Sequence, residues 1–152
     1  MTAYVQQADF DVSQEMTALR AERTDIGAVV TFTGCVRGKV GDQHLHRMYL
    51  EHYPGMTERE LARIENEANA RWPLQASLII HRYGNLEPGD NIVLVAAASL
   101  HRHAAFEAAQ FMMDYLKTHA PFWKKEIYAN GAGGWVDARD KDDQAVQRWL
   151  QT

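Results

Sequence analysis

The sequence has 152 residues, of which 46% are hydrophobic and 24% charged, a composition typical of a folded, water-soluble protein. Its net charge of −4 argues against nucleic-acid binding, which usually requires a strongly basic surface. No apolar run approaches the roughly 20 residues that span a bilayer, and the N-terminus lacks the features of a signal peptide. We therefore expect one cytoplasmic domain over residues 1–152, with neither a membrane nor a nucleic-acid partner.

The first part of the chain predicts two strands and a helix before a polar segment. The expected elements are an edge strand at Ala3–Gln7, a helix at Val12–Glu22 and a mostly buried strand at Gly27–Arg37, which is rich in β-branched residues. Gly38–His46 is polar and contains glycine, which is typical of a mobile loop. The alternating pattern of Arg47–Tyr53 predicts another strand.

Two longer helices and two apolar strands follow. Thr57 and Glu60 fit a capping box that opens a helix ending near Arg71, with an inner stripe of Leu61, Ile64, Ala68 and Trp72. Strands are expected at Leu74–Tyr83 and Ile92–Ser99, joined by a loop of turn-forming residues. A helix from about His103 to the residues before Pro121 has an apolar stripe of Phe106, Ala109, Met113 and Leu116.

The C-terminal segment predicts strands at Trp123–Ala129 and Trp135–Ala138 and a helix at Asp140–Leu150. Strands thus come in pairs between helices, unlike the strict alternation of a doubly wound parallel sheet. We expect an α+β fold with a mixed sheet, flanking helices and a small antiparallel β subdomain.

Two lysines flank the break that Pro121 imposes. Lys117 falls on the last helical turn, and Lys124 follows the break beside Phe122 and Trp123. Together they could bind an anion, or one could lose its proton through desolvation and act as an acid, base or nucleophile. The alternative is that these lysines only complement the dipole at the helix C-terminus.

Two further segments place polar residues at the ends of strands. At Gly34–Arg37, backbone amides and the Arg37 guanidinium could hold a phosphate, although a plain strand exit would have the same composition. At Ser99–Arg102, a strand-to-helix junction offers free amides and the side chains of His101 and Arg102.

A basic pocket in an acidic protein indicates a small anionic substrate rather than a polymer. Its expected cations are Arg37, Arg102, Lys117 and Lys124.

The histidine pairs and the single cysteine do not predict a metal site or a catalytic nucleophile. The His-x-His pairs His44/His46 and His101/His103 lack the Cys or carboxylate partners of a zinc site, so no metal is expected. Cys35 is the single cysteine, which excludes an internal disulfide, and no pattern pairs it with a base.

Taken together, these segments resemble the large, catalytic subunit of molybdopterin synthase along nearly the whole chain. The matching blocks are Gly27-Ala-Val-Val-Thr-Phe-Thr-Gly34, Leu50-Glu-His-Tyr-Pro-Gly-Met56, Ile80-His-Arg-Tyr-Gly84, Ser99-Leu-His-Arg102, and Asp114-Tyr-Leu-Lys-Thr-His-Ala-Pro-Phe-Trp-Lys-Lys-Glu126. The last block and Ser99–Arg102 are the most specific.

The resemblance implies an α/β hammerhead fold and a sulfurtransferase of molybdenum cofactor biosynthesis. Enzymes of this family add two dithiolene sulfurs to cyclic pyranopterin monophosphate, with no bound cofactor. The sulfur comes from the C-terminal Gly-Gly thiocarboxylate of a small ubiquitin-like carrier subunit. A homodimer of catalytic subunits binds one carrier at each end, which gives a heterotetramer.

The resemblance also implies the site residues. Lys117 and Lys124 match the catalytic lysines, with Lys117 as acid or base beside the carrier's terminal glycine and Lys124 orienting the pterin. Arg37, His101 and Arg102 would hold the phosphate. The implied substrate-binding set is Cys35, Val36, Arg37, His101, Arg102, Lys117, Lys124, Lys125, Glu126 and Arg139, the last from either protomer.

Two other functions stay open at this point. A noncatalytic module could bind a ubiquitin-like tail or a phosphorylated metabolite without turnover. A lyase could instead form a Schiff base through a desolvated Lys117.

Overall fold

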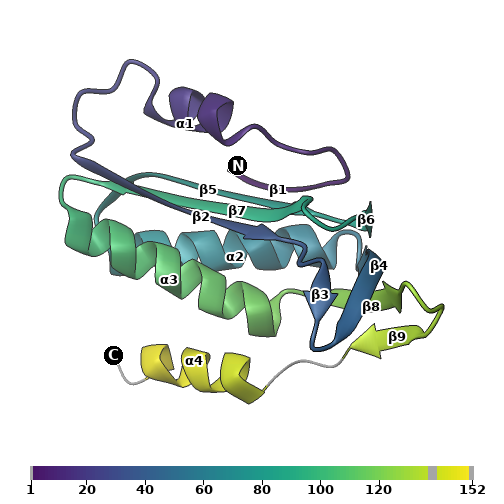
Figure 1. Ribbon diagram of the computed structural model, residues 1–152. Coiled ribbons are helices and arrows are strands. Elements are labelled where there is room, and N and C mark those ends of the chain that lie inside the picture. Colours follow the sequence, from purple (N-terminus) through teal and green to yellow (C-terminus); the bar gives the residue numbers. More distant parts are fainter. Residues whose placement is uncertain (1, 137–139, 151–152) are drawn as a thin grey trace.

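The computed structural model describes residues 2–136 and 140–150, which form four helices and two β-sheets (Figure 1). The first sheet has the order β1 (Ala3–Gln6), β5 (Leu74–Arg82), β7 (Asn91–Ser99), β2 (Ala28–Cys35). β1 runs parallel to β5, and the other pairs are antiparallel. The mixed sheet and the α+β class predicted from the sequence are confirmed.

Helices cover both faces of this sheet (Figure 1). α1 (Val12–Arg20) lies on one face, and α2 (Met56–Arg71) and α3 (Arg102–His119) lie side by side on the other. α4 (Asp140–Leu150) packs against α3 on the side away from the sheet. Within the described residues, no helix is long and apolar enough to cross a bilayer.

A second, antiparallel sheet lies beyond the end of α3 (Figure 1). Its order is β3 (Lys39–Val40), β4 (Gln43–His52), β8 (Phe122–Tyr128), β9 (Gly133–Val136), and the short β6 (Gly84–Leu86) also pairs with β4. β8 follows α3 directly in the chain, so the end of this helix fixes where the second sheet begins. The expected small antiparallel β subdomain is this sheet.

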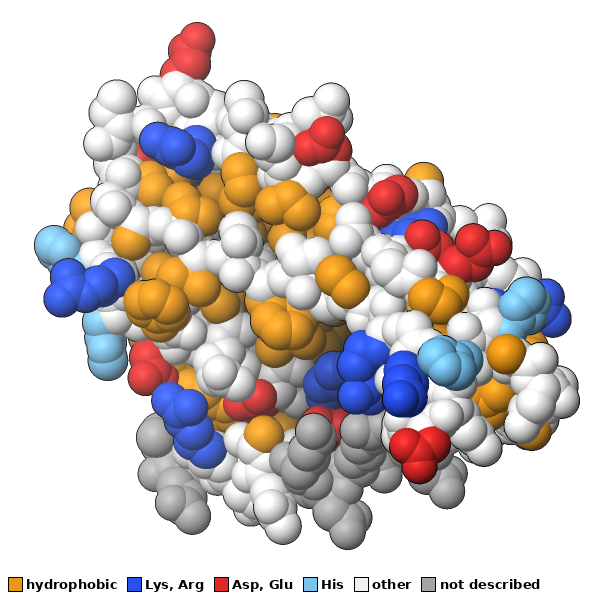
Figure 2. Space-filling view, viewed as in Figure 1, with side chains coloured by type: hydrophobic (Ala, Val, Ile, Leu, Met, Phe, Trp, Pro, Cys, Tyr) orange, Lys and Arg blue, Asp and Glu red, His pale blue; other side chains and the backbone are white. Residues whose placement is uncertain are grey.

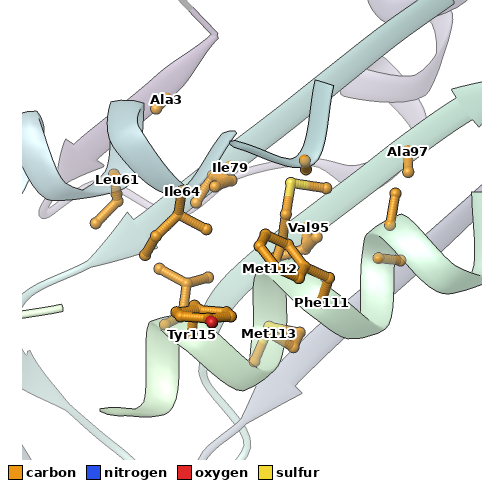
Figure 3. Close-up of a cluster of buried hydrophobic side chains, with 14 of the residues drawn as sticks. Ala3, Leu61, Ile64, Ile79, Val95, Ala97, Phe111, Met112, Met113 and Tyr115 are labelled. Atoms are coloured by element: carbon orange, nitrogen blue, oxygen red, sulfur yellow. The ribbon is translucent and has the colours of Figure 1, made fainter. Parts of the chain in front are cut away.

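Alternation along β5 and β7 explains why the first sheet can be covered on both faces. Ile79 and Val95 point into a core shared with α2 and α3, where Phe111 and Met112 are almost fully buried (Figure 3). The residues that alternate with them face α1 and form a smaller cluster with Phe10. A period of two with apolar residues on both faces is expected for a sheet between two helical layers.

The expected loop at Gly38–His46 is instead a hairpin. β3 pairs with β4 through Lys39 opposite His44 and Val40 opposite Gln43, and the turn between them has Gly41 at a φ of +61°. A two-residue turn with glycine in the left-handed region suits this tight connection. The polar composition hid a short strand pair, so the loop prediction was wrong.

The start of α2 also differs from the expected capping box. The helix begins at Met56, and the Gly55 amide donates to the Glu58 carboxylate at 2.5 Å. The Thr57 hydroxyl lies inside the first turn and donates to the Tyr53 carbonyl at 2.9 Å. The glutamate half of the capping box therefore exists two residues earlier than the sequence pattern suggested, whereas Gly55 has no side chain to supply the other half.

One member of the expected apolar stripe of α3 is on the surface. Ala109, Met113 and Leu116 are buried, but 59% of Phe106 is exposed. α3 approaches the sheet through the fully buried alanines Ala105 and Ala108. Small side chains permit a close helix–sheet contact, which leaves the larger Phe106 beside the contact rather than in it.

The C-terminal helix is fixed to α3 by a buried polar contact. The Trp149 indole Nε1 donates to the Asp114 carboxylate at 2.7 Å, and Gln110 donates to the other carboxylate oxygen at 2.8 Å. The Trp149 ring meets Phe111 and Trp72 edge to face. Because a buried carboxylate without donors is costly, this contact holds α4 in one position.

We expect Trp149→Phe to lower the free energy of unfolding by about 1–3 kcal/mol, because it removes a buried donor while leaving most of the ring packing. Chemical denaturation measures this. As a control, Trp123→Phe changes a tryptophan that is 48% exposed and should shift stability by no more than about 0.5 kcal/mol. Equal losses in the two variants would show that the Asp114 contact does not anchor α4.

Candidate functional site

The break between α3 and β8 determines how the lysines are placed. α3 ends at His119, and Ala120 is extended with φ −72° and ψ 130°, as expected for a residue before proline. β8 begins two residues later, and its alternation sends Lys124 to one face and Lys125 to the other.

A cavity of about 350 Å³ lies where the two sheets and the end of α3 meet. Lys117 reaches it from the last turn of α3, and Lys124 and Glu126 reach it from β8. Cys35 and Arg37, at and just after the end of β2, complete its polar wall, while Leu45, Met48, Leu50, Ile92 and Phe122 supply apolar surface. Figure 2 shows Lys and Arg side chains gathered on this face near the end of α3 and the β3–β4 hairpin.

Charge in the cavity is mixed but leans positive. Arg37, Lys117 and Lys124 face two carboxylates, Glu126 and Asp142. The Lys124 ammonium lies 3.7 Å from the Glu126 carboxylate, whose side chain is only 4% exposed. Among the described residues that line the cavity, three cations against two carboxylates leave one net positive charge for an anionic ligand.

A hydrogen bond from Tyr128 also holds the Glu126 side chain in place. The Tyr128 hydroxyl donates to its Oε2 at 3.1 Å. Burial, and then the adjacent carboxylate, raise the pKa of Tyr128, so this hydroxyl stays a donor. With Tyr128 and Lys124 both at its oxygens, the Glu126 side chain is held in one position beside the Lys124 ammonium.

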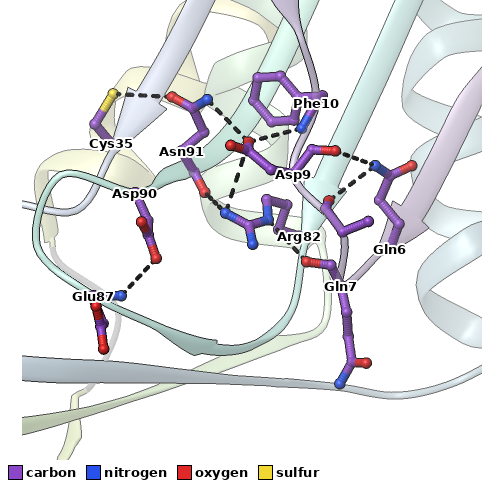
Figure 4. A network of polar contacts seen from close by, with 10 residues as sticks. Gln6, Gln7, Asp9, Phe10, Cys35, Arg82, Glu87, Asp90 and Asn91 are labelled. Atoms are coloured by element: carbon purple, nitrogen blue, oxygen red, sulfur yellow. Dashed lines mark hydrogen bonds and ion pairs between the residues drawn. The ribbon is translucent and has the colours of Figure 1, made fainter.

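Cys35 belongs to a polar network at the cavity wall (Figure 4). Its thiol donates to the Asn91 side-chain oxygen at 3.7 Å, and the Asn91 amide donates to the Asp9 carboxylate at 3.0 Å. Asp9 also accepts the Phe10 amide and lies 3.8 Å from Arg82. The Asn91 hydrogen bond is the main cause of a lowered pKa at Asp9, so Asp9 is a carboxylate and fixes the direction of the Asn91 amide.

This network gives Cys35 a hydrogen-bond acceptor but no base. Asn91 cannot take a proton from the thiol, so the contacts of the described residues do not activate Cys35 as a nucleophile. Among the described residues, no group of three or more His, Cys, Asp or Glu side chains could hold a metal ion.

Several residues of the expected site lie elsewhere. Val36 is 3% exposed and packs in the core of the second sheet. The Lys125 ammonium lies over the Trp135 ring, 5.8 Å from its centre, on the face of β8 away from the cavity. Arg139 is outside the described residues.

The expected pocket of Arg37, Arg102, Lys117 and Lys124 does not form within one chain. His101 and Arg102 stand at the start of α3, whereas Lys117 stands near its end. The helix has 18 residues, a length of about 27 Å. Because both ends of a straight helix cannot reach one small cavity, His101 and Arg102 do not line it.

The structure adds His81, which the sequence reading left out of the site. His81 lines the cavity from β5, and its ring stacks on Phe122 with centres 3.7 Å apart and planes 17° from parallel. Its Nδ1 lies 2.9 Å from the Arg82 carbonyl oxygen. The signal was present in the Ile80–Gly84 block, but nothing in one sequence distinguishes a cavity histidine from a packed one.

The pKa of His81 is lowered from 6.5 to about 4, chiefly by burial and to a smaller extent by the charges of Lys117 and His52, while the hydrogen bond to the Arg82 carbonyl partly opposes the shift. His81 is therefore neutral at physiological pH. The imidazole adds no charge to the cavity.

A family model, curated sequences and solved structures all match this chain to the same family. A family model described as MoaE protein matches residues 5–119. The molybdopterin synthase catalytic subunit of Rhizobium meliloti strain 1021 is 58% identical over 152 residues, covering 99% of this chain and 97% of the relative. The solved MoaE protein of Burkholderia ambifaria MC40-6 superposes with a TM-score of 0.84 at 50% identity, covering 98% of this chain and 97% of that one.

A more distant structure shares the fold. It is a complex of subunits 1 and 2 of the molybdopterin-converting factor from Helicobacter pylori 26695, with a TM-score of 0.74 at 19% identity, covering 91% of this chain and 92% of that one.

We expect the free energy of unfolding to decrease as the pH is lowered, and part of this decrease to depend on His81. The unfolded chain takes up a proton near pH 6.5 but the folded chain only near pH 4, so stability present above pH 6.5 is lost as the pH falls toward 4. The loss attributable to this group is at most about 3 kcal/mol. Denaturation of the wild type and of His81→Phe at both ends of this range measures the loss; parallel losses in the two proteins would contradict the lowered pKa of His81.

Proposed function

Because this chain belongs to the MoaE protein family, we propose that it works as the catalytic subunit of a molybdopterin synthase, a sulfurtransferase of molybdenum cofactor biosynthesis. The observation that carries the mechanism is the convergence of Lys117 and Lys124 on one cavity with a fixed carboxylate, Glu126. Sulfur transfer needs a site that binds an anion, moves protons and limits water. The cavity supplies cations for an anion and groups that can donate or accept protons, and the contacts of the described residues do not activate its thiol.

The proposed substrate is cyclic pyranopterin monophosphate. The proposed sulfur donor is the C-terminal Gly-Gly thiocarboxylate of a small ubiquitin-like partner. A two-subunit complex in a protein of the same fold supports such a partner. In this scheme the carrier brings the nucleophilic sulfur, which fits a chain whose single cysteine hydrogen-bonds, among the described residues, to the Asn91 amide rather than to a base.

Each lysine has a distinct proposed role. Lys117 is exposed at the cavity wall, where an incoming tail would reach it, and it acts as acid or base beside the terminal glycine. Lys124 is held by Glu126 and orients the pterin. Arg37 binds the phosphate from the end of β2.

The other two readings receive less support. A Schiff-base lysine is usually desolvated, whereas Lys117 is exposed. A pure binding module would not need two lysines and a fixed carboxylate in one cavity, although only a turnover measurement separates it from an enzyme.

The homodimer implied by the resemblance offers a place for His101 and Arg102. β2 is an edge strand, with no strand paired to its outer side among the described residues. Its start lies beside the end of β7, where Gly27 is packed so closely that a side chain there would collide with the Leu100 carbonyl. Its other end runs to Arg37 and the cavity.

We propose that two copies pair through β2 in antiparallel fashion. A two-fold axis across the strand would bring the start of one β2 to the end of the other. His101 and Arg102 of one protomer would then lie near Arg37 of its partner and complete the phosphate site. Exposed apolar side chains, Phe32 (43%) and Phe106 (59%), support a covered surface here, and Figure 2 shows hydrophobic side chains along this face.

We expect Lys117→Ala to lower turnover by at least about 100-fold, the usual contribution of a general acid or base. The assay combines the purified chain, a thiocarboxylated carrier and cyclic pyranopterin monophosphate, with mass spectrometry of the dithiolene product. Arg59→Ala, which removes an exposed cation from α2, is the matched control and should keep wild-type turnover.

Normal turnover in a folded Lys117→Ala variant would reject the role of this lysine. A wild type that binds the carrier and the pterin but forms no product would instead favour the binding module.

Subunit mixing tests the proposed dimer. Lys117→Ala and Arg102→Ala chains should each be inactive alone, but a mixed dimer would hold one intact site. Random exchange of subunits should restore about a quarter of wild-type activity, because about half of the dimers are mixed and each has one working site of two. No recovery after verified exchange would mean that Arg102 does not act on the partner's site.

A further inference from the structure

His81 combines a fixed ring with an unused acceptor atom. A carbonyl oxygen can only accept a hydrogen bond, so the Nδ1 that lies 2.9 Å from the Arg82 carbonyl must carry the proton. In the neutral ring, Nε2 then has a free lone pair. No hydrogen bond to Nε2 is found among the described residues, although the ring lines the cavity.

The ring is held in this orientation from two directions. The Arg82 carbonyl fixes one edge, and the stack on Phe122, with centres 3.7 Å apart, fixes the plane. Phe122 itself lines the cavity from β8. An acceptor with a set tautomer and a set plane is pre-organised for a donor of matching direction.

Among the described residues, the other polar side chains of the cavity offer no uncharged oxygen or nitrogen acceptor. Arg37, Lys117 and Lys124 only donate, and the acceptors of Glu126 and Asp142 are carboxylate oxygens. Among the described residues that line the cavity, His81 is the one side chain with an uncharged nitrogen or oxygen acceptor. An uncharged acceptor can bind an N–H group without repelling a phosphate nearby.

We propose that Nε2 of His81 accepts a hydrogen bond from an N–H group of the pterin ring, and so makes His81 a specificity-determining residue of the substrate site. The inference rests on the proposed function, because a reduced pterin carries N–H donors on its ring and amino group as well as an anionic phosphate. In this arrangement the cations bind the phosphate, and His81 recognises the pterin ring through a hydrogen bond.

The test compares two substitutions at His81. His81→Phe keeps an aromatic ring on Phe122 but has no acceptor, and His81→Gln places an amide oxygen close to the position of Nε2. We expect His81→Phe to weaken binding of cyclic pyranopterin monophosphate about tenfold, the effect of leaving one buried donor unpaired, with His81→Gln recovering most of it. His46→Phe, at an exposed histidine outside the cavity, is the control and should bind like the wild type.

Nitrogen NMR of the imidazole measures the chemical shift of Nε2. If His81 had only a structural role, this shift would not change when the pterin binds. In the free wild type, His81 should show a protonated Nδ1 and a bare Nε2 at neutral pH, assigned by its loss in His81→Gln. Adding the pterin should shift the Nε2 resonance in the direction of hydrogen-bond acceptance. Adding the unmodified carrier alone should leave that resonance unchanged.

The possible results separate this inference from the function on which it rests. If the wild type neither binds nor converts the pterin, the proposed function fails and His81 loses its ligand. If the wild type binds and converts it, but the Nε2 resonance stays in place or both substitutions weaken binding equally, only the role of His81 is overturned. A shift caused by the carrier alone would assign the donor to the peptide tail and would likewise overturn it.

Discussion

The helix-to-strand break at Ala120–Pro121 is the constraint on which the site depends. α3 is pressed against the first sheet through small side chains, and β8 is paired with β4 over the length of the second sheet. The two residues between them allow no slack, so the relative position of the two sheets is fixed where they meet. The cavity occupies this junction, and the two lysines reach it because one precedes the break by a helical turn and the other follows it at the right strand parity.

Around that junction the structure fixes the positions of Glu126 and Lys124 and keeps His81 neutral. Tyr128 keeps Glu126 in place, and Glu126 orients Lys124. His81 stays neutral because its surroundings are buried and already positive. A cavity with fixed cations and a neutral acceptor can distinguish parts of one ligand: its anionic group is attracted by charge, and the rest is read by hydrogen bonds, which depend on direction.

The sequence predicted the elements whose signals are local. The period-two strands, the long helices and the stop at Pro121 all follow from spacing and backbone chemistry, and α4 was predicted with its observed bounds. The errors arose where tertiary contacts decide. The hairpin at Lys39–Val40 gains its pairing from β4, and Phe106 is outside because alanines permit the closer contact. His81 became visible as a site residue only when β5 and β8 were brought together.

The distance between Arg102 and Lys117 along α3 gives a physical reason why the substrate site would need a second copy of the chain. α3 is a rigid spacer whose start and end cannot serve one cavity, yet both ends carry groups suited to an anionic substrate. Each β2 strand begins opposite Ser99, near the start of α3, and ends near Arg37. Antiparallel pairing of two β2 edges would therefore bring Arg102 of one protomer toward the cavity of its partner. In such a dimer the phosphate contacts from the partner would form only on assembly, whereas Lys117 and Lys124 would be in place within each chain. Substrate affinity would then depend on dimerisation, while the groups proposed for proton transfer would not.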